Sequence, residues 1–92
     1  MKEPGPWLVY LLRCGDGTLY AGITNDLPHR LSVHRAGKGA AYTRSRRPLK
    51  LVYREGVAGR SEALKREAAL RRLTRAEKLS LVREARRART PK

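Results

Sequence analysis

The chain has 92 residues and a mass of 10.4 kDa, which suits one compact domain and excludes two independent cores. Lys and Arg total 22 against 8 for Asp and Glu, and the resulting formal net charge of +14 favours a polyanionic partner. Nucleic acid is a better candidate for this partner than a membrane, because no apolar run of about 20 residues occurs. The single cysteine, Cys14, and an N-terminus without an apolar leader predict a cytoplasmic protein.

The first half of the chain predicts a hairpin followed by a helix. In residues 7–14, apolar side chains occupy both the odd and the even positions, which point to opposite faces of a strand. This pattern is typical of a central strand that is covered on both faces. Residues 19–24 return as the second strand after a Gly-Asp-Gly turn. A helix is then expected from the N-cap residues Asn25 and Asp26 to about Ala36.

The second half predicts a loop, a strand and two helices. A basic, glycine-flanked loop is expected over residues 37–48, and an edge strand with one charged face over residues 49–57. Ser61 can cap a helix that runs to about residue 73. The T-x-x-E capping box at residues 74–77 then starts a last helix that runs to about residue 88.

The predicted order is therefore β-β-α-β-α-α, which is an α+β fold with helices packed on a small sheet. No internal repeat divides the chain, so residues 1–92 should form this single domain. A flexible leader is expected over residues 1–6 and a frayed basic tail over residues 89–92.

Two tyrosines on the hairpin are the first candidates for chemistry. The short turn places Tyr10 opposite Gly22 and Tyr20 opposite Leu12, so both rings share one face, about 7 to 8 Å apart as diagonal neighbours. Gly22 leaves space beside Tyr10 that a ligand can fill. The alternative is that both are ordinary strand residues, since tyrosine has a high β-propensity.

The helix after the hairpin carries Arg30 and His34 one turn apart, on the border of the buried stripe that Leu27 marks. A guanidinium at this seam can hold a phosphate, and an imidazole can donate to the phosphate or move a proton near neutral pH. The alternative is a solvated helix flank with a partly covered histidine.

Glu67 interrupts the side of its helix that should face the sheet, because its neighbours at i−4, i−3 and i+3 are all apolar. Arg71, at i+4, can be its partner in a structural ion pair. A divalent cation is the other candidate, since Mg²⁺ is commonly held by one carboxylate with waters and phosphate oxygens. In a chain with so few acids, the second interpretation carries weight.

The loop over residues 37–48 alternates cations with an aromatic ring. The residues expected to contact nucleic acid are Lys38, Tyr42, Arg44, Arg46 and Arg47. The cations can contact phosphates, and the ring of Tyr42 can stack on a base. A charge run that serves solubility is the alternative.

Together these residues resemble the GIY-YIG nuclease superfamily, and its small stand-alone bacterial members in particular. Residues 8–10, Leu-Val-Tyr, stand in place of the first triplet, and residues 20–22, Tyr-Ala-Gly, in place of the second. With Arg30, His34 and Glu67 the resemblance extends over most of residues 7–82. It implies a three-stranded antiparallel sheet flanked by helices, and phosphodiester cleavage with one divalent cation, Mg²⁺ or Mn²⁺.

The resemblance also implies a role for each site residue. Tyr10 would act as the general base or orient the attacking water, and Tyr20 would help to position that water. Arg30 would stabilise charge on the phosphorus centre, and His34 matches members that carry a histidine on this helix. Glu67 would ligate the metal. This division suits phosphodiester hydrolysis, which needs an activated nucleophile, a cation on the developing charge and help for the leaving oxygen.

We therefore expect a metal-dependent endonuclease module that acts on DNA. Branched, damaged or single-stranded forms are the candidate substrates, because nothing in the chain resembles a base-reading element. A non-catalytic nucleic-acid binder with the same fold is the alternative, since Ile23 stands where some family members have a lysine. An RNA-associated basic protein is a third candidate. No sequence feature identifies a protein partner.

Overall fold

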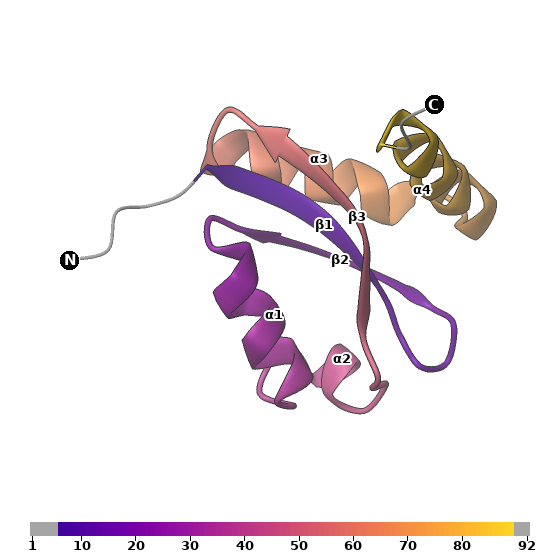
Figure 1. Cartoon of the computed structure of the whole chain (residues 1–92). Coiled ribbons are helices and arrows are strands. Elements are labelled where there is room, and N and C mark those ends of the chain that lie inside the picture. The colour runs from indigo at the N-terminus through magenta and orange to yellow at the C-terminus, as the bar shows by residue number, and fades with distance from the viewer. Residues whose placement is uncertain (1–5, 90–92) are drawn as a thin grey trace.

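The computed structural model describes residues 6–89, so nearly all of the expected leader and tail lies outside the described residues. Along the chain the elements are β1 (Trp7–Arg13), β2 (Leu19–Thr24), α1 (Leu27–Arg35), α2 (Ala41–Arg44), β3 (Lys50–Val57), α3 (Arg60–Arg72) and α4 (Arg75–Arg89) (Figure 1). This order confirms the predicted β-β-α-β-α-α arrangement and adds one short helix, α2. No helix within the described range is both long and apolar enough to cross a bilayer.

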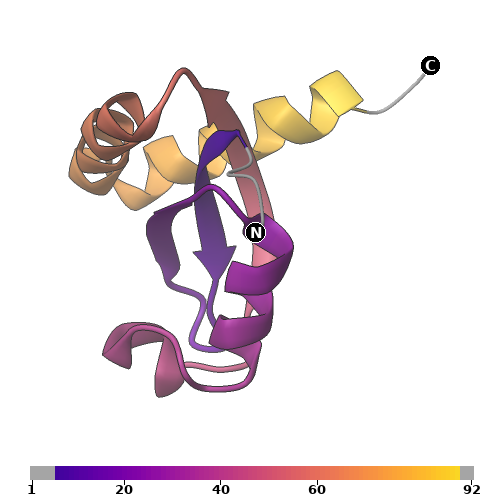
Figure 2. The same cartoon turned by 90° about the vertical axis from the view of Figure 1, so that its left-hand side faces the viewer.

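The three strands form one antiparallel sheet in the order β2-β1-β3, so β1 is the central strand, as predicted. Side chains alternate between the two faces of a strand, and both alternating sets of β1 are apolar. Figures 1 and 2 show the reason: α3 and α4 cover one face of the sheet, and α1 and α2 cover the other.

The hydrophobic core therefore has two parts, one on each face of the sheet, and β1 contributes residues to both. The core beneath α3 and α4 contains Val9, Leu11, Ala21, Tyr53, Ala63, Leu70 and Val82. The core beneath α1 contains Tyr10, Leu12, Cys14, Leu27 and Leu49. Tyr10 thus belongs to the part of the core beneath α1, where its buried hydroxyl needs a hydrogen-bond partner.

The hairpin has the predicted register, with Tyr10 paired with Gly22 and Leu12 with Tyr20. Its turn is closed by Asp16, whose carboxylate accepts hydrogen bonds from the backbone N–H and the hydroxyl of Thr18, at 3.1 and 2.6 Å. Gly17 has a φ of +85°, which a residue without a side chain adopts easily. The turn chemistry therefore determines which side chains of β1 and β2 share a face.

Helix α1 begins as predicted, with Asp26 at the N-cap accepting a hydrogen bond from the backbone N–H of His29 at 3.3 Å. The capping box before α4 is also confirmed. The backbone N–H of Thr74 donates to Glu77 at 2.8 Å, and the backbone N–H of Glu77 donates to Thr74 Oγ1 at 3.2 Å.

Two local predictions were wrong. Helix α3 begins at Arg60 after Gly59, without a side-chain cap, so Ser61 lies inside the first turn and is not the N-cap. The segment predicted as an exposed loop contains α2, in which Thr43 is fully buried. Four residues have little intrinsic helical stability. Contacts with α1, described below, stabilise α2, and no local sequence pattern reports them.

Candidate active site

The hydroxyl of Tyr10 is at the centre of a cluster of side chains from four elements. His34 Nε2, from α1, lies 3.0 Å from this hydroxyl. Arg30 of α1, Tyr20 of β2 and Glu67 of α3 all lie close enough to act electrostatically on the same phenol. The structure therefore brings together the five residues that the sequence analysis proposed for chemistry.

Tyr10 is almost fully buried, and its ring lies directly over Gly22 on the neighbouring strand. A Cβ atom at position 22 would overlap the phenol oxygen and the ring carbon that bears it. The expectation that a ligand fills the space beside Gly22 was therefore wrong, because the ring of Tyr10 itself occupies it. Glycine at this position allows the phenol to lie flat across the edge strand.

His34 is fully buried and is part of a chain of three hydrogen bonds. Thr43 Oγ1 donates to the carbonyl oxygen of Ala40 at 3.0 Å, so it accepts from His34 Nδ1, also at 3.0 Å. With its ring proton on Nδ1, His34 presents Nε2 as an acceptor, and the Tyr10 hydroxyl donates to it. Thr43 thus selects the tautomer of His34 that can take a proton from Tyr10.

Burial and nearby charges keep both Tyr10 and His34 neutral. Burial lowers the pKa of His34 from its ordinary 6.5, and the positive charge of Arg30 lowers it further. Burial also raises the pKa of Tyr10 above 10, with Tyr20 and Glu67 contributing to the rise and Arg30 opposing it. At neutral pH the site therefore contains a protonated phenol hydrogen-bonded to an unprotonated imidazole.

We expect the folding stability to fall as the pH is lowered from 7.5 to 5. The pKa of His34 is lower in the folded protein, so the unfolded chain binds the proton more tightly. This stability is complete above the ordinary pKa of about 6.5 and is lost as the pH falls towards the folded value. Thermal unfolding across this pH range measures the effect.

The variant His34→Asn should be less stable at neutral pH, but its midpoint should vary less with pH. His29, the other histidine, is exposed, so His29→Asn serves as the control and should keep the parent's pH dependence. The same pH dependence in the His34→Asn variant would contradict the assignment.

Glu67 lies on α3, in the layer opposite to α1, and is close enough to Tyr10 to act on it electrostatically. Its side chain is 16% exposed, and Arg71 donates to its Oε2 at 3.3 Å. Both partners that the sequence analysis considered are therefore consistent with its position. The ion pair with Arg71, a 59% exposed side chain, contributes little, about 0.3 to 0.5 kcal/mol.

A stack of side chains continues the site beyond Tyr20. The Tyr20 ring packs edge-on to His34, with 5.8 Å between the ring centroids, and is stacked on Tyr42 at 5.6 Å. The guanidinium of Arg46 lies 3.9 Å from the centroid of the Tyr42 ring and donates to Asp16 at 3.0 Å. The structure therefore brings Tyr42 and Arg46 to the edge of the site.

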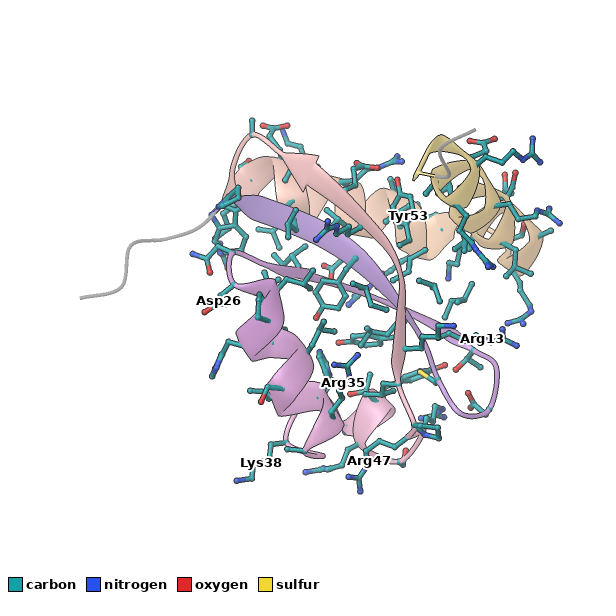
Figure 3. All side chains as sticks on the ribbon, in the orientation of Figure 1. Arg13, Asp26, Arg35, Lys38, Arg47 and Tyr53 are labelled. Atoms are coloured by element: carbon teal, nitrogen blue, oxygen red, sulfur yellow. The ribbon has the colours of Figure 1, made fainter. Side chains whose placement is uncertain are left out.

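The other cations of the predicted loop lie elsewhere. Arg47 donates to the carbonyl oxygen of Arg35 at 3.5 Å, and Lys38 follows the same end of α1, away from the sheet (Figure 3). Arg44 is exposed on α2. These three side chains are not part of the cluster around Tyr10, and as nucleic-acid contacts they remain a prediction.

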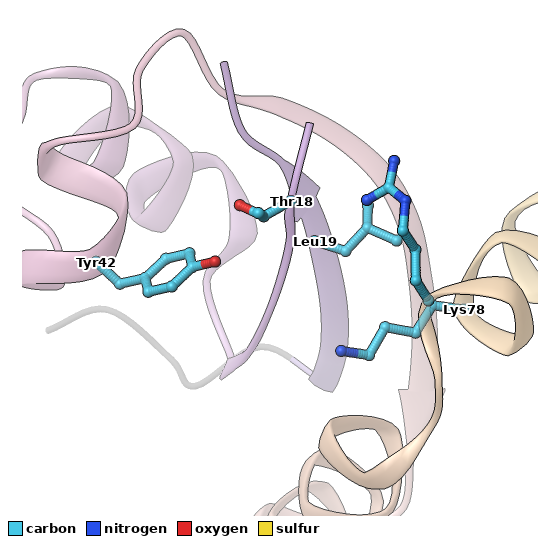
Figure 4. A pocket seen from close by; sticks show the side chains of 5 residues that line it. Thr18, Leu19, Tyr42 and Lys78 are labelled. Carbon is cyan, nitrogen blue, oxygen red and sulfur yellow. The ribbon is translucent and has the colours of Figure 1, made fainter. Parts of the chain in front are cut away.

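Sequence reasoning missed a pocket that adjoins the Tyr42 stack. A cavity of about 240 Å³ lies between α2 and α4 at the start of β2, lined by Thr18, Leu19, Tyr42, Arg75 and Lys78 (Figure 4). Its cations come from α4, more than 50 residues after β2. In the sequence they belong to a run of charged helical residues, which by itself is indistinguishable from a solvated face.

Comparison with known proteins agrees with this arrangement. The model of the GIY-YIG catalytic domain matches residues 6–80, which contain all five clustered residues. The chain belongs to the GIY-YIG family. Members of this family are nucleases, so the GIY-YIG assignment implies a nucleic-acid substrate and, in general, dependence on a divalent metal ion.

The GIY-YIG relatives include small bacterial proteins. A UPF0213 protein of Desulfotalea psychrophila is 53% identical over 77 residues, which are 83% of this chain and 70% of that protein. The solution structure of a UPF0213 protein from Bacillus halodurans has a TM-score of 0.53 and 41% identity, and covers 83% of this chain and 81% of that one. A solution structure of an E. faecalis protein has a TM-score of 0.60 and 33% identity, over 100% and 97% of the two chains. These likenesses confirm a small stand-alone GIY-YIG member.

Proposed function

We propose that this protein is a metal-dependent endonuclease that hydrolyses phosphodiester bonds in DNA. The hydrogen bond between the Tyr10 hydroxyl and His34 Nε2 is the observation that carries the proposal. A buried phenol that donates to a buried, unprotonated imidazole is a proton relay, and a module that only binds nucleic acid has no use for one.

The relay supplies the base for hydrolysis. As a water attacks phosphorus, Tyr10 accepts the water proton and passes its own proton to His34 Nε2. The raised pKa of Tyr10 makes this coupled transfer necessary, because the free phenolate is scarce at neutral pH. Thr43 keeps the second ring nitrogen of His34 in the donor role throughout.

Arg30 and Tyr20 bind the phosphate and orient the base, respectively. Arg30 is exposed on α1 beside the phenol, where its guanidinium can hold the scissile phosphate and stabilise the charge that develops on it. Tyr20 packs against the His34 ring and limits its orientation. The attacking water is thereby positioned between Tyr10 and the phosphate that Arg30 binds.

Glu67 suits a hard divalent cation. Among residues 6–89 no three His, Cys, Asp or Glu side chains cluster, so the donor that we assign to the ion is the partly buried carboxylate of Glu67. Mg²⁺ and Mn²⁺ accept this arrangement, because waters and phosphate oxygens complete their coordination. When bound, such an ion polarises the phosphate and lowers the pKa of a coordinated water.

Binding to duplex DNA should be steeply salt-dependent and weakly sequence-specific. Arg30, Arg44 and the pocket cations Arg75 and Lys78 should contact phosphates, and no described helix presents a base-reading set. With about four to six phosphate contacts, the slope of log K against log salt should be about −4 to −5. Fluorescence anisotropy at several salt concentrations measures it.

The variants Lys78→Gln and Arg44→Gln should each reduce this salt slope by about 1 without a change in sequence preference. An affinity that does not change between low and physiological salt would contradict the phosphate contacts.

The function itself is tested by incubating the protein with end-labelled branched, single-stranded and linear DNA, with Mg²⁺, with Mn²⁺ and with chelator. We expect cleavage with either ion and none with chelator, and faster cleavage of the branched or single-stranded forms. Matched RNA substrates test the choice of nucleic acid. Tight binding to every DNA without cleavage under any condition would support the non-catalytic binder instead.

A further inference from the structure

The pocket between α2 and α4 contains a half-buried lysine that no carboxylate neutralises. Of the four lysines in the part of the chain that the structure describes, Lys38, Lys50 and Lys65 are exposed, whereas Lys78 is half-buried. None of the described residues that line the pocket is acidic, and Lys78 forms no ion pair within residues 6–89. Lysine is seldom withdrawn from water without a partner, so an anionic group is the expected ligand.

The other walls of the pocket suit a nucleobase. Thr18 Oγ1 donates to Asp16 at 2.6 Å, so it faces a ligand as a hydrogen-bond acceptor. The hydroxyl of Tyr42 points toward β2, where Thr18 and Leu19 lie (Figure 4). Leu19 supplies an apolar surface. A base has donors and acceptors along its edge and an apolar face, and these walls match both.

The pocket is fixed in shape by a contact between elements that are distant in the chain. Arg75, in the first turn of α4, donates to the carbonyl oxygen of Gly17 in the hairpin turn. The guanidinium keeps further N–H donors for a phosphate. Because α2, β2 and α4 all contribute walls, a base can enter only after it has left the helical stack.

Two ring contacts connect the pocket to the site around Tyr10. The Tyr20 ring centroid lies 5.8 Å from that of His34 and 5.6 Å from that of Tyr42. Each stacked nucleotide advances a strand by about 3.4 Å, so a strand that contacts Arg30 reaches the pocket within about three nucleotides.

We propose that this pocket holds one unpaired nucleotide of the DNA substrate, close to the bond that is cut. Lys78 and Arg75 bind its phosphate, and its base lies against Leu19 and the hydroxyl of Tyr42. This inference rests on the proposed function and defines the substrate more closely. Branched, damaged and single-stranded DNA all offer an unpaired nucleotide, whereas a paired base has to be unstacked first, which costs free energy.

The test compares three duplexes with the same number of base pairs: fully paired, with one unpaired thymidine, and with an abasic nucleotide in place of that thymidine. Affinities are measured by fluorescence anisotropy in chelator, so that nothing is cleaved. The parent should bind the duplex with the unpaired thymidine about tenfold more tightly than the paired one. The abasic duplex keeps the extra phosphate and the flexibility but should lose most of this preference. Equal affinity for the abasic and thymidine forms would overturn the proposal.

Two variants assign the preference to the pocket. Leu19→Trp fills it and should reduce the tenfold preference to less than about twofold, while the affinity for the paired duplex stays within about twofold. Leu64→Trp makes the same substitution at a 41% exposed position of α3 and should keep the full preference. Tyr42→Phe keeps the ring on Tyr20, removes only the hydroxyl and should lower the preference by about threefold. An equal loss in Leu64→Trp, or a full preference in both pocket variants, would contradict the assignment.

Cleavage provides an independent readout. With Mg²⁺, moving the unpaired thymidine along the duplex should move the cut with it, at a constant offset of about three nucleotides or fewer. Cleavage at positions that do not follow the thymidine would overturn the subsite and leave the nuclease proposal intact. The tenfold binding preference without cleavage of any DNA would contradict the nuclease proposal and leave the subsite supported.

Discussion

Replacing Tyr10 by Phe should lower the single-turnover rate of DNA cleavage by about 10² or more. The variant keeps the ring over Gly22 but removes the oxygen that, in the proposed mechanism, accepts the proton from water and donates its own proton to His34. DNA affinity should not change, because the phenol is almost fully buried. Rates are measured with enzyme in excess over a labelled substrate, so that product release does not limit them.

Stability needs its own control in this experiment. Tyr10→Phe leaves the buried Nε2 of His34 without its donor, which should cost about 1 kcal/mol of folding free energy. Tyr53→Phe removes the hydroxyl of another buried tyrosine, which donates to Glu55 at 2.6 Å on the far side of the sheet, and it should cleave at the parent rate. A parent-like rate in Tyr10→Phe would remove Tyr10 from the mechanism.

Glu67→Gln should abolish metal-dependent cleavage, a loss of about 10³ or more, while the protein stays folded and binds DNA. Glutamine preserves the volume of the side chain and removes the charge that a hard cation needs. The variant should also lose Mn²⁺ binding, measured by paramagnetic resonance without DNA. This second readout separates a metal ligand from a residue that only shapes the site.

Two variants serve as controls for this prediction. Glu55 is a partly buried carboxylate in an ion pair with Arg66 at 2.8 Å, on the α3 and α4 side of the sheet, so Glu55→Gln should keep full activity. Arg71→Ala removes the ion-pair partner of Glu67 and should alter stability by about 0.5 kcal/mol or less. Cleavage by Glu67→Gln at the parent rate would refute the metal role.

The proposed relay between Tyr10 and His34 explains why α2 belongs to the candidate active site. Thr43 contributes no group to the substrate, yet its hydroxyl determines which nitrogen of His34 bears the proton. Gly39 allows this geometry, since a Cβ atom there would overlap the imidazole. In the proposed mechanism the segment over residues 37–48 therefore orients His34 from beneath the site, in addition to the nucleic-acid contacts that we predict for its cations.

The sequence by itself determined the features that depend on neighbours along the chain. The strand pattern over residues 7–14 and the Gly-Asp-Gly turn placed Tyr10 and Tyr20 on one face, because turn length dictates hairpin register. Helical spacing placed Arg30 and His34 together, and the capping box located the start of α4. Each of these signals acts over a few residues, so local physics is sufficient.

Only the tertiary structure decided how those pieces meet. His34 was as compatible with a partly covered flank as with burial, until α2 packed over it and Thr43 set its tautomer. The approach of Glu67 to Tyr10 and the pocket lined by Tyr42 and Lys78 join elements that are distant in the chain. Their proximity depends on how helices pack across the two faces of the sheet, and residue spacing carries no information about that packing.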